Sequence, residues 1–201
     1  VVCTGGLGGR KAVVASGKKF SYDYVFGPAV GQEEVYETVC EPIVTEVLQG
    51  YNCTVFAYGQ TGTGKTHTME GARDEEGNLR TEESRLPEGA GIIPRAIKQV
   101  FDFLRSIHEE YTVRVSHVEL YNEQITDLLS GSDDLQDILR IYEDPQKGTF
   151  VQGMEEILVR SEDEIFAILE KSAAKRRTAE TLMNKYSSRS HSVFTVTIHI
   201  K

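Results

Sequence analysis

The sequence has no tryptophan, only three cysteines and no long apolar run. Cys3, Cys40 and Cys53 are too few for a disulfide framework and lack the C-x-x-C spacing of zinc sites, so we expect reduced thiols. No stretch approaches the ~20 apolar residues that a membrane-spanning helix needs, and no basic segment leads into an apolar stretch at the N-terminus. These absences argue against a membrane protein or a disulfide-rich secreted domain, and they predict a soluble intracellular protein.

An excess of basic residues is also lacking. The 201 residues include 22 Lys and Arg and 31 Asp and Glu, which gives a formal net charge of −9. Because nucleic acid is bound through a basic surface, this charge argues against nucleic acid as the main partner, although a local basic patch could still bind an acidic polymer. With 39% hydrophobic and 26% charged residues, the chain has the composition of one globular domain with a substantial core.

A glycine-rich segment is the most informative stretch of the chain. Residues 55–70 read VFAYGQTGTGKTHTME, in which Gly59, Gly64, Lys65 and Thr66 satisfy the P-loop pattern G-x-x-x-x-G-K-[ST]. Glycines let the backbone curl so that its N–H groups point at phosphates. The lysine would reach the β- and γ-phosphates, and the threonine hydroxyl would ligate Mg²⁺.

The flanks of this segment favour a phosphate-binding loop over an ordinary glycine-rich turn. A P-loop lies between a strand and a helix, and Thr54–Tyr58 is a β-branched and aromatic run of strand length. Residues 67–70 can continue as a helix.

A proline interrupts the helical pattern that precedes this segment. The pattern of 32–49 contains Pro42, which should bend or break that helix.

The hydrophobic periodicity of the rest of the chain alternates between strand and helix. Residues 71–91 form a long polar insertion. It has two possible interpretations, a functional loop and a surface loop that is merely tolerated. The patterns predict strands over 11–15, 19–26, 111–120, 138–141, 150–159 and 191–200, and helices over 32–49 and 94–104, from 123 to 129, and after a capping box at 161–164.

A second polar constellation lies between a predicted helix and a predicted strand. Residues 184–191 read NKYSSRSH, with three serines, an asparagine and an arginine. A γ-phosphate with its Mg²⁺ and attacking water would use such groups, whereas a plain polar linker is the alternative. A Ser/His hydrolase is rejected because Ser190 and His191 would point to opposite faces of a strand and no G-x-S-x-G elbow precedes them.

The chain resembles the kinesin motor domain in three segments, which occur in the family's order. Residues 56–66, FAYGQTGTGKT, are similar to the kinesin P-loop, 184–191 are similar to its switch I, N-x-x-S-S-R-S-H, and 119–123, ELYNE, also match the family pattern. The resemblance covers essentially the whole chain. It implies an α/β P-loop NTPase fold of three layers, in which helices flank a central mixed, mainly parallel sheet. Residues 1–201 would then be a motor-domain fragment with its P-loop at 59–66, a long surface loop at 71–91 and switch I at 184–191.

The resemblance also implies ATP and Mg²⁺ as ligands and assigns roles to residues. Thr66 and Ser188 would share Mg²⁺, and His67 would stack near the adenine. The residues expected to bind nucleotide are Gly59, Gln60, Thr61, Gly62, Thr63, Gly64, Lys65, Thr66 and His67. The residues expected to act in catalysis are Asn184, Ser187, Ser188 and Arg189, where Asn184 and Ser187 face the γ-phosphate and lytic water and Arg189 pairs with a switch II glutamate. Arg176 matches the family arginine of the helix before switch I.

The implied function is a microtubule-stimulated ATP hydrolase that moves along microtubules, with tubulin as partner and neither nucleic acid nor membrane. Residues 173–184 and the long loop look most like the bipolar, tetrameric mitotic kinesins (BimC-type), although the tryptophan typical of that loop is absent. This implies a cytoplasmic protein on spindle microtubules, and a homo-oligomer formed through a coiled-coil stalk outside this chain. Lys147, at the tip of a predicted turn, matches a region where kinesins touch tubulin.

Two parts of the family pattern have no counterpart in the sequence. Between Val1 and Lys201 the sequence contains neither the R-x-R-P strand that opens the family pattern nor switch II, D-x-x-G-S-E. We therefore expect the isolated chain to bind nucleotide weakly and to hydrolyse little. The alternative class is a non-motor kinesin relative that binds microtubules as a scaffold. Four intact residues argue against it, namely Lys65, Thr66, Ser188 and Arg189.

Overall fold

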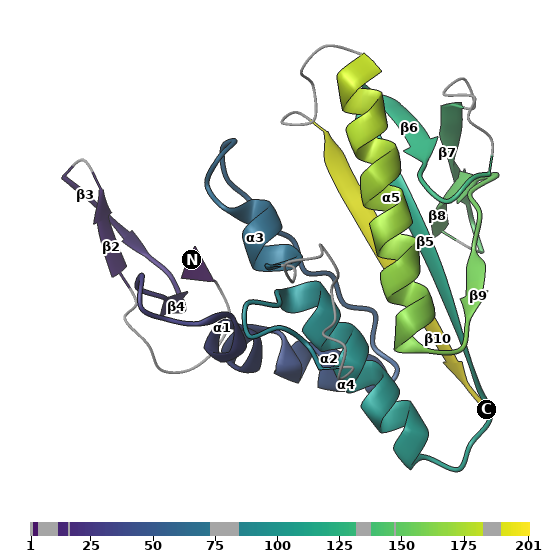
Figure 1. Ribbon diagram of the computed structural model, residues 1–201, viewed down its shortest axis with the longest axis horizontal. Helices are drawn as coiled ribbons and strands as arrows, with labels where there is room; N and C mark the ends of the chain where they lie inside the picture. Colours follow the sequence, from purple (N-terminus) through teal and green to yellow (C-terminus); the bar gives the residue numbers. More distant parts are fainter. Residues whose placement is uncertain are drawn as a thin grey trace. The chain divides into compact units, whose positions relative to one another are not determined.

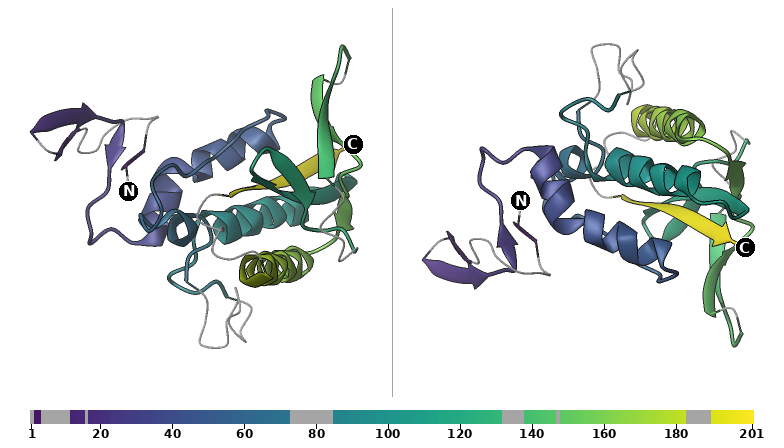
Figure 2. Two further views of the ribbon diagram at one scale, coloured as in Figure 1. Left: turned by 90° about the horizontal axis from the view of Figure 1, so that it is seen from above. Right: turned by 90° about the horizontal axis from the view of Figure 1, so that it is seen from below.

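The computed structural model describes residues 2–3, 12–15, 17–72, 85–131, 138–146, 148–182 and 190–201. The chain forms two compact units, Val1–Phe103 and Leu104–Lys201 (Figures 1 and 2). Each unit is described by itself below.

Four short strands open the first unit. Strands β2 (Ala12–Ala15) and β3 (Lys18–Ser21) form the predicted hairpin, in which Gly17 takes a φ of 74° in the turn. The second strand of this hairpin ends earlier than expected. Strand β4 (Tyr24–Val25) pairs instead with β1 (Val2–Cys3), a strand that the glycine-rich N-terminal sequence does not predict.

The helical stretch around Pro42 is divided in two, as predicted. Helix α1 (Gln32–Val39) ends at Cys40, and α2 (Glu41–Leu48) begins there with the proline in its first turn. A proline is tolerated at that position because the first N–H groups of a helix have no carbonyl partner within the helix. Gly50, with a φ of 100°, follows the end of α2 as expected.

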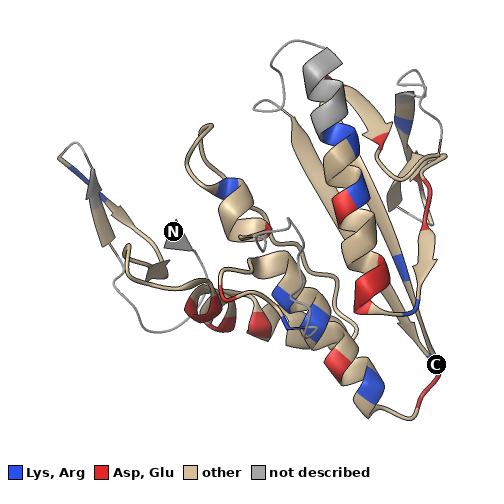
Figure 3. Ribbon diagram, viewed as in Figure 1, with Lys and Arg blue, Asp and Glu red and all other residues tan. Residues whose placement is uncertain are grey.

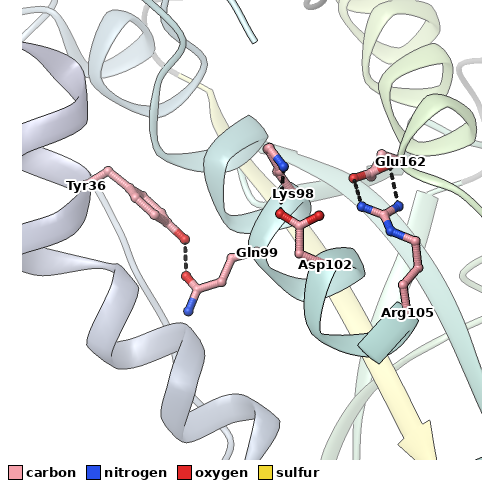
Figure 4. A network of polar contacts seen from close by, with 6 residues as sticks. All are labelled: Tyr36, Lys98, Gln99, Asp102, Arg105 and Glu162. Carbon is pink, nitrogen blue, oxygen red and sulfur yellow. Dashed lines mark hydrogen bonds and ion pairs between the residues drawn. The ribbon is translucent and has the colours of Figure 1, made fainter. Parts of the chain in front are cut away.

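The core of the first unit joins α1 to α4 (Ile92–Ser106). Buried Tyr36, Cys40 and Ile92 form this cluster, and the partly buried side chains packed against it are Val39, Val55, Met69 and Ala96. The Tyr36 hydroxyl donates a hydrogen bond to Oε1 of Gln99 (Figure 4). Nε2 of Gln99 donates in turn to the Glu41 carbonyl at 3.2 Å. Burial raises the pKa of Tyr36 above its usual value, so its hydroxyl remains a donor.

The second unit is built on a sheet whose central strand is β5 (Tyr111–Tyr121). On one side β5 pairs with β10 (His191–Ile200) along its whole length, for example Val193 with Val118. Its other side pairs with β6 (Gln124–Asp127) and with β9 (Ile157–Val159), and β7 (Ile138–Asp144) and β8 (Gly148–Gln152) extend the sheet beyond β6. Every strand pair among the described residues is antiparallel, so the parallel part of the predicted sheet is not seen in them.

The helix predicted between 123 and 129 is wrong, because this stretch begins with β6. Asn122 and Glu123 take φ values of 49° and 60°, which make a two-residue turn of the kind that closes antiparallel hairpins. Ile125 and Asp127 are buried while Thr126 between them is less so, which is the period of a strand. Backbone pairing with β5 therefore decides the structure of a segment whose local pattern was ambiguous.

Helix α5 (Glu162–Leu182) lies along one face of this sheet (Figure 1). The predicted cap is present, since the Glu164 N–H donates to Oγ of Ser161 at 3.3 Å. Both terminal nitrogens of Arg105 donate to the Glu162 carboxylate at 3.0 Å (Figure 4). Acidic side chains in the first turn of α5 match the positive end of the helix dipole (Figure 3). Among the described helices, none is long and apolar enough to cross a membrane.

A histidine lies inside the second unit. His117 on β5 is only 6% exposed, its Nε2 is 2.7 Å from Oγ of Ser192, and its ring meets the edge of Phe194. Its Nδ1 is buried and has no hydrogen-bond partner among the described residues. Burial, together with the charge of Arg176, lowers the pKa of His117 to about 4 against the opposing effects of Glu119 and Asp127.

This buried imidazole should make the unit sensitive to acid. Between pH 6.5 and 4 the unfolded chain takes up a proton that folded His117 refuses, so stability falls as the pH falls through this window. We expect a loss of up to about 3 kcal/mol that His117→Phe does not show, measured by urea unfolding at pH 7 and pH 4.5. Equal pH dependence in both proteins would contradict the assignment.

Candidate functional site

The glycine-rich loop forms a tight turn at the start of a short helix. Gly62 and Gly64 have φ values of 81° and 90°, a conformation that other residues rarely adopt, and α3 (Lys65–Met69) begins directly after them. A side chain at Gly59 would meet the Thr63 hydroxyl at 2.5 Å. The hydroxyl of Thr63 in turn donates to the Gln60 carbonyl at 2.8 Å. Of the two glycines that the P-loop pattern fixes, Gly64 is favoured by its backbone conformation and Gly59 by the nearby Thr63 side chain. Gly62, which the pattern leaves open, is also favoured by its positive φ.

Lys65 spans this loop. Its ammonium donates to the carbonyls of Gly59 at 2.7 Å and Gln60 at 2.9 Å, so the positive charge lies across the loop from the first turn of α3. Residues 60–64 are exposed, as is Thr66 beside the lysine. A cation, a hydroxyl and an accessible glycine backbone at one helix start are the groups that hold a polyphosphate and its Mg²⁺. The residues present therefore fit the predicted ligands.

The strand predicted before the loop is not formed. Thr54–Tyr58 is not assigned as a strand, and among the described residues no strand pairs with it. Phe56 is 80% exposed and Tyr58 is 96% exposed. A β-strand needs a neighbour to share its hydrogen bonds, so propensity alone does not make one. Only Val55 of this run packs against the core of the first unit.

His67 is held by a residue that the motif analysis missed. Nε2 of Gln32, at the start of α1, donates to the His67 carbonyl at 2.6 Å and lies 3.1 Å from Nδ1 of its ring. The pair ties α1 to α3, and a glutamine 35 residues away offered no local signal.

The long insertion begins where α3 ends, and its two ends are paired. The Gly91 N–H donates to the Glu70 carbonyl at 3.0 Å, and the Ala72 N–H donates to the Gly89 carbonyl at 2.8 Å. A Cβ at Gly71 would lie 2.1 Å from the Gly91 nitrogen, and Gly71 also has a φ of 83°. Two backbone segments therefore meet at glycine because no side chain fits between them.

Of the switch-like segment 184–191, the structure describes Ser190 and His191. Asn184, Ser187, Ser188 and Arg189 lie outside the described residues, as does Lys147. Arg176, on α5, donates from Nε to Oε1 of Glu119 at 3.0 Å. The hydroxyl of Ser190 donates to the same oxygen at 2.6 Å, and Nη2 of Arg176 is 3.4 Å from that hydroxyl.

The role of Glu119 as the centre of this cluster was not predicted. The sequence did contain one signal for this role. Every second side chain of a strand lies on the same face, and Glu119 falls on the face of β5 that carries buried Val113, Val115 and His117. A carboxylate in phase with a buried face needs a partner. Naming that partner as Arg176, 57 residues away, required the fold.

Comparison with known proteins agrees with these features. The protein-family model described as the kinesin motor domain matches residues 8–201 of this chain. Kinesin-like protein KIF11-A of Xenopus laevis is 54% identical over 92% of this chain and 17% of its own length. Kinesin-like protein KIN-5A of Oryza sativa subsp. japonica is 52% identical over 92% of this chain and 18% of its own length. A solved structure, described as that of a fast kinesin, is 40% identical with a TM-score of 0.79, over 90% of this chain and 48% of that one.

The fold and the glycine loop define a P-loop NTPase of the α/β class. More particularly, the chain belongs to the kinesin motor domain family, as the sequence predicts. The KIF11 and KIN-5 names of its relatives confirm the BimC-type resemblance. The chain spans less than a fifth of the length of these two relatives.

The glycine contact beside α3 gives a test of the loop geometry. Gly71→Ala should destabilise the chain by about 1–3 kcal/mol, because the added methyl collides with backbone and the positive φ is strained. Gly27→Ala is the matched control, since nothing lies within 4 Å of its added Cβ. Thermal unfolding measures both variants, and equal midpoints would show that the ends of the insertion are not closely packed.

Proposed function

We propose that this chain is the ATP-binding part of a motor domain that hydrolyses ATP and moves along microtubules. The observation that carries the proposal is the ammonium of Lys65, which lies across the glycine loop at the start of α3. The solved relative supports it, since that fast kinesin is described with an ATPase mechanism and interactions with microtubules. ATP hydrolysis supplies the free energy for movement.

Each part of the glycine loop has a proposed role in binding. The backbone of 59–66, with Gln60, Thr61, Gly62 and Thr63 within it, would surround the phosphates, and Lys65 would leave the loop carbonyls for the β- and γ-phosphates. The exchange would be favourable because phosphate oxygens carry negative charge, whereas the loop carbonyls are neutral acceptors. His67, which Gln32 contacts at its carbonyl and its ring, would present the face of that ring to the adenine.

The second set of proposed residues belongs to the segment after α5. Thr66 and Ser188 would hold Mg²⁺ through their hydroxyl oxygens, which suit a hard cation. Asn184 and Ser187 would orient the lytic water, and Arg189 would pair with a switch II glutamate. Mg²⁺ would neutralise charge that develops on the phosphate oxygens during transfer.

For the whole protein we propose a place on the microtubule cytoskeleton, in particular the mitotic spindle, and assembly through a stalk outside this chain. The KIF11 and KIN-5 relatives support this assignment by similarity. The second candidate function is a non-motor kinesin that binds microtubules as a scaffold. The intact loop, with its lysine bonded across it, favours the enzyme.

The proposal predicts ATP turnover that depends on Lys65. In the full-length protein, microtubules should stimulate Mg·ATP turnover, and Lys65→Ala should abolish it and weaken nucleotide binding at least about tenfold, because a charge-assisted contact is lost. Lys171→Ala, at an exposed position on α5, is the matched control and should leave turnover unchanged. Phosphate release and binding of a fluorescent ATP analogue measure the two effects.

Two other outcomes would contradict this assignment. A folded protein that binds microtubules without Lys65-dependent turnover would favour the scaffold. Turnover that survives Lys65→Ala would show that another site is responsible.

A further inference from the structure

One glutamine makes two contacts with the same residue beside the glycine loop. Nε2 of Gln32, the first residue of α1, donates to the His67 carbonyl at 2.6 Å and lies 3.1 Å from Nδ1 of the His67 ring. His67 is on α3, the helix that begins with Lys65. A single amide thus reaches both the backbone and the ring of a residue of the candidate nucleotide site.

The contact with the carbonyl completes the end of a very short helix. The last carbonyls of a helix have no donor within it, and α3 has only 5 residues. The Gly71 N–H, which a longer helix would direct to the His67 carbonyl, donates to the Thr66 carbonyl at 3.3 Å. Gln32 supplies a donor from another helix instead. The orientation of the His67 backbone therefore depends on α1.

The glutamine is itself attached to a packed element. Tyr36, one turn further along α1, is buried in the core of the first unit, and Met69 of α3 packs against the same core. Gln32 is half-buried, whereas His67 is exposed. Core packing therefore sets the position of the amide, and the ring of His67 is restrained at Nδ1 while it remains open to a ligand.

Two exposed rings beside the loop differ in how they are held. Tyr58, immediately before the loop, is 96% exposed, so its ring has almost no contact with the protein. The ring of His67 is also exposed but has the Gln32 amide at its Nδ1. Bases stack on such rings, and a ring that is already restrained loses less conformational entropy when the base binds. His67 is therefore the better stacking surface of the two.

We propose that Gln32 is a positioning residue for the nucleotide base, which acts by holding His67 where the adenine stacks. This inference rests on the proposed function, in which the phosphates lie on the glycine loop and the adenine lies near His67. Lys65 is held by the carbonyls of Gly59 and Gln60 and has no contact with Gln32 among its hydrogen bonds. The contribution of Gln32 should therefore fall on the part of the affinity that depends on the base.

The test compares a ligand that has a base with one that lacks it, in the full-length protein. Gln32→Met keeps the length and the helix propensity of the side chain but removes the amide donor. We expect the Kd of a non-hydrolysable ATP analogue with Mg²⁺ to rise about three- to tenfold, because the ring must then be ordered on binding. The Kd of Mg·tripolyphosphate should change by less than about twofold, because its phosphates meet only the loop. Calorimetric titration measures both constants.

The choice of base gives a second readout. The ratio of kcat/KM for ATP to kcat/KM for CTP should fall at least about twofold in Gln32→Met. The physical reason is that a pyrimidine offers a smaller stacking surface than a purine and gains less from a ring that is held in place. A merely structural role of Gln32 would lower both values together and leave the ratio unchanged.

A double-mutant cycle separates the ring contact from the carbonyl contact. His67→Ala removes the ring but keeps the carbonyl, and it should weaken binding of the ATP analogue at least as much as Gln32→Met does. Added to His67→Ala, Gln32→Met should weaken this binding by less than about twofold more, because no ring is left to hold. The matched control is Glu37→Met, at an exposed position of the same helix, which should leave both Kd values unchanged. Thermal unfolding of each variant checks that the protein is folded.

The outcomes distinguish this inference from the proposed function. Folded Gln32→Met that binds the ATP analogue within about twofold of the unsubstituted protein would overturn the inference, as would additive losses in the double variant. Equal losses for the analogue and for tripolyphosphate would also overturn it, because Gln32 would then support the whole loop and not the base. The proposed function fails on a different result, namely that the unsubstituted protein shows no turnover that Lys65→Ala abolishes. Binding of the two ligands is measured without turnover, so the two failures are separate.

Discussion

The backbone pairing of β5 is the constraint on which the second unit depends. This strand pairs with β10 along its length and with β6 and β9 on its other side, so its backbone groups are satisfied on both edges. The side chains of β5 then have fixed faces. His117 and Glu119 lie on one face, where Ser192, Ser190 and Arg176 reach them. The polar cluster is thus a consequence of strand register, since a shift of one residue would turn both side chains to the opposite face.

The glycine loop of the first unit depends on a different constraint. Its conformation needs positive φ at Gly62 and Gly64, and its ends are secured by the packing of Val55 and Met69 against the core around Tyr36. The charged group that a polyphosphate would meet is thereby attached to a packed helix start. Loop geometry and core packing together give the lysine a defined position before any ligand binds.

Sequence reasoning succeeded where the local signal was unambiguous. The division at Pro42, the short helix after Gly64, and β10 agree with prediction because each follows from backbone chemistry or from strict alternation. It failed for Thr54–Tyr58, which has strand propensity but no described neighbour, and for Gln124–Asp127, which a hairpin converts to strand. In both cases the deciding factor was the presence or absence of a pairing partner.

The amino-acid sequence by itself determined the family and the candidate phosphate-binding residues. The reason is that Gly59, Lys65 and Thr66 lie close together in the chain, at the fixed spacing of a phosphate-binding motif. Only the tertiary structure decided which distant groups support them. Gln32 reaches His67 across 35 residues, and Arg176 reaches Glu119 across 57. Such pairs leave no periodic trace in the chain, since their contact depends on how helices and strands pack and not on the spacing of the residues.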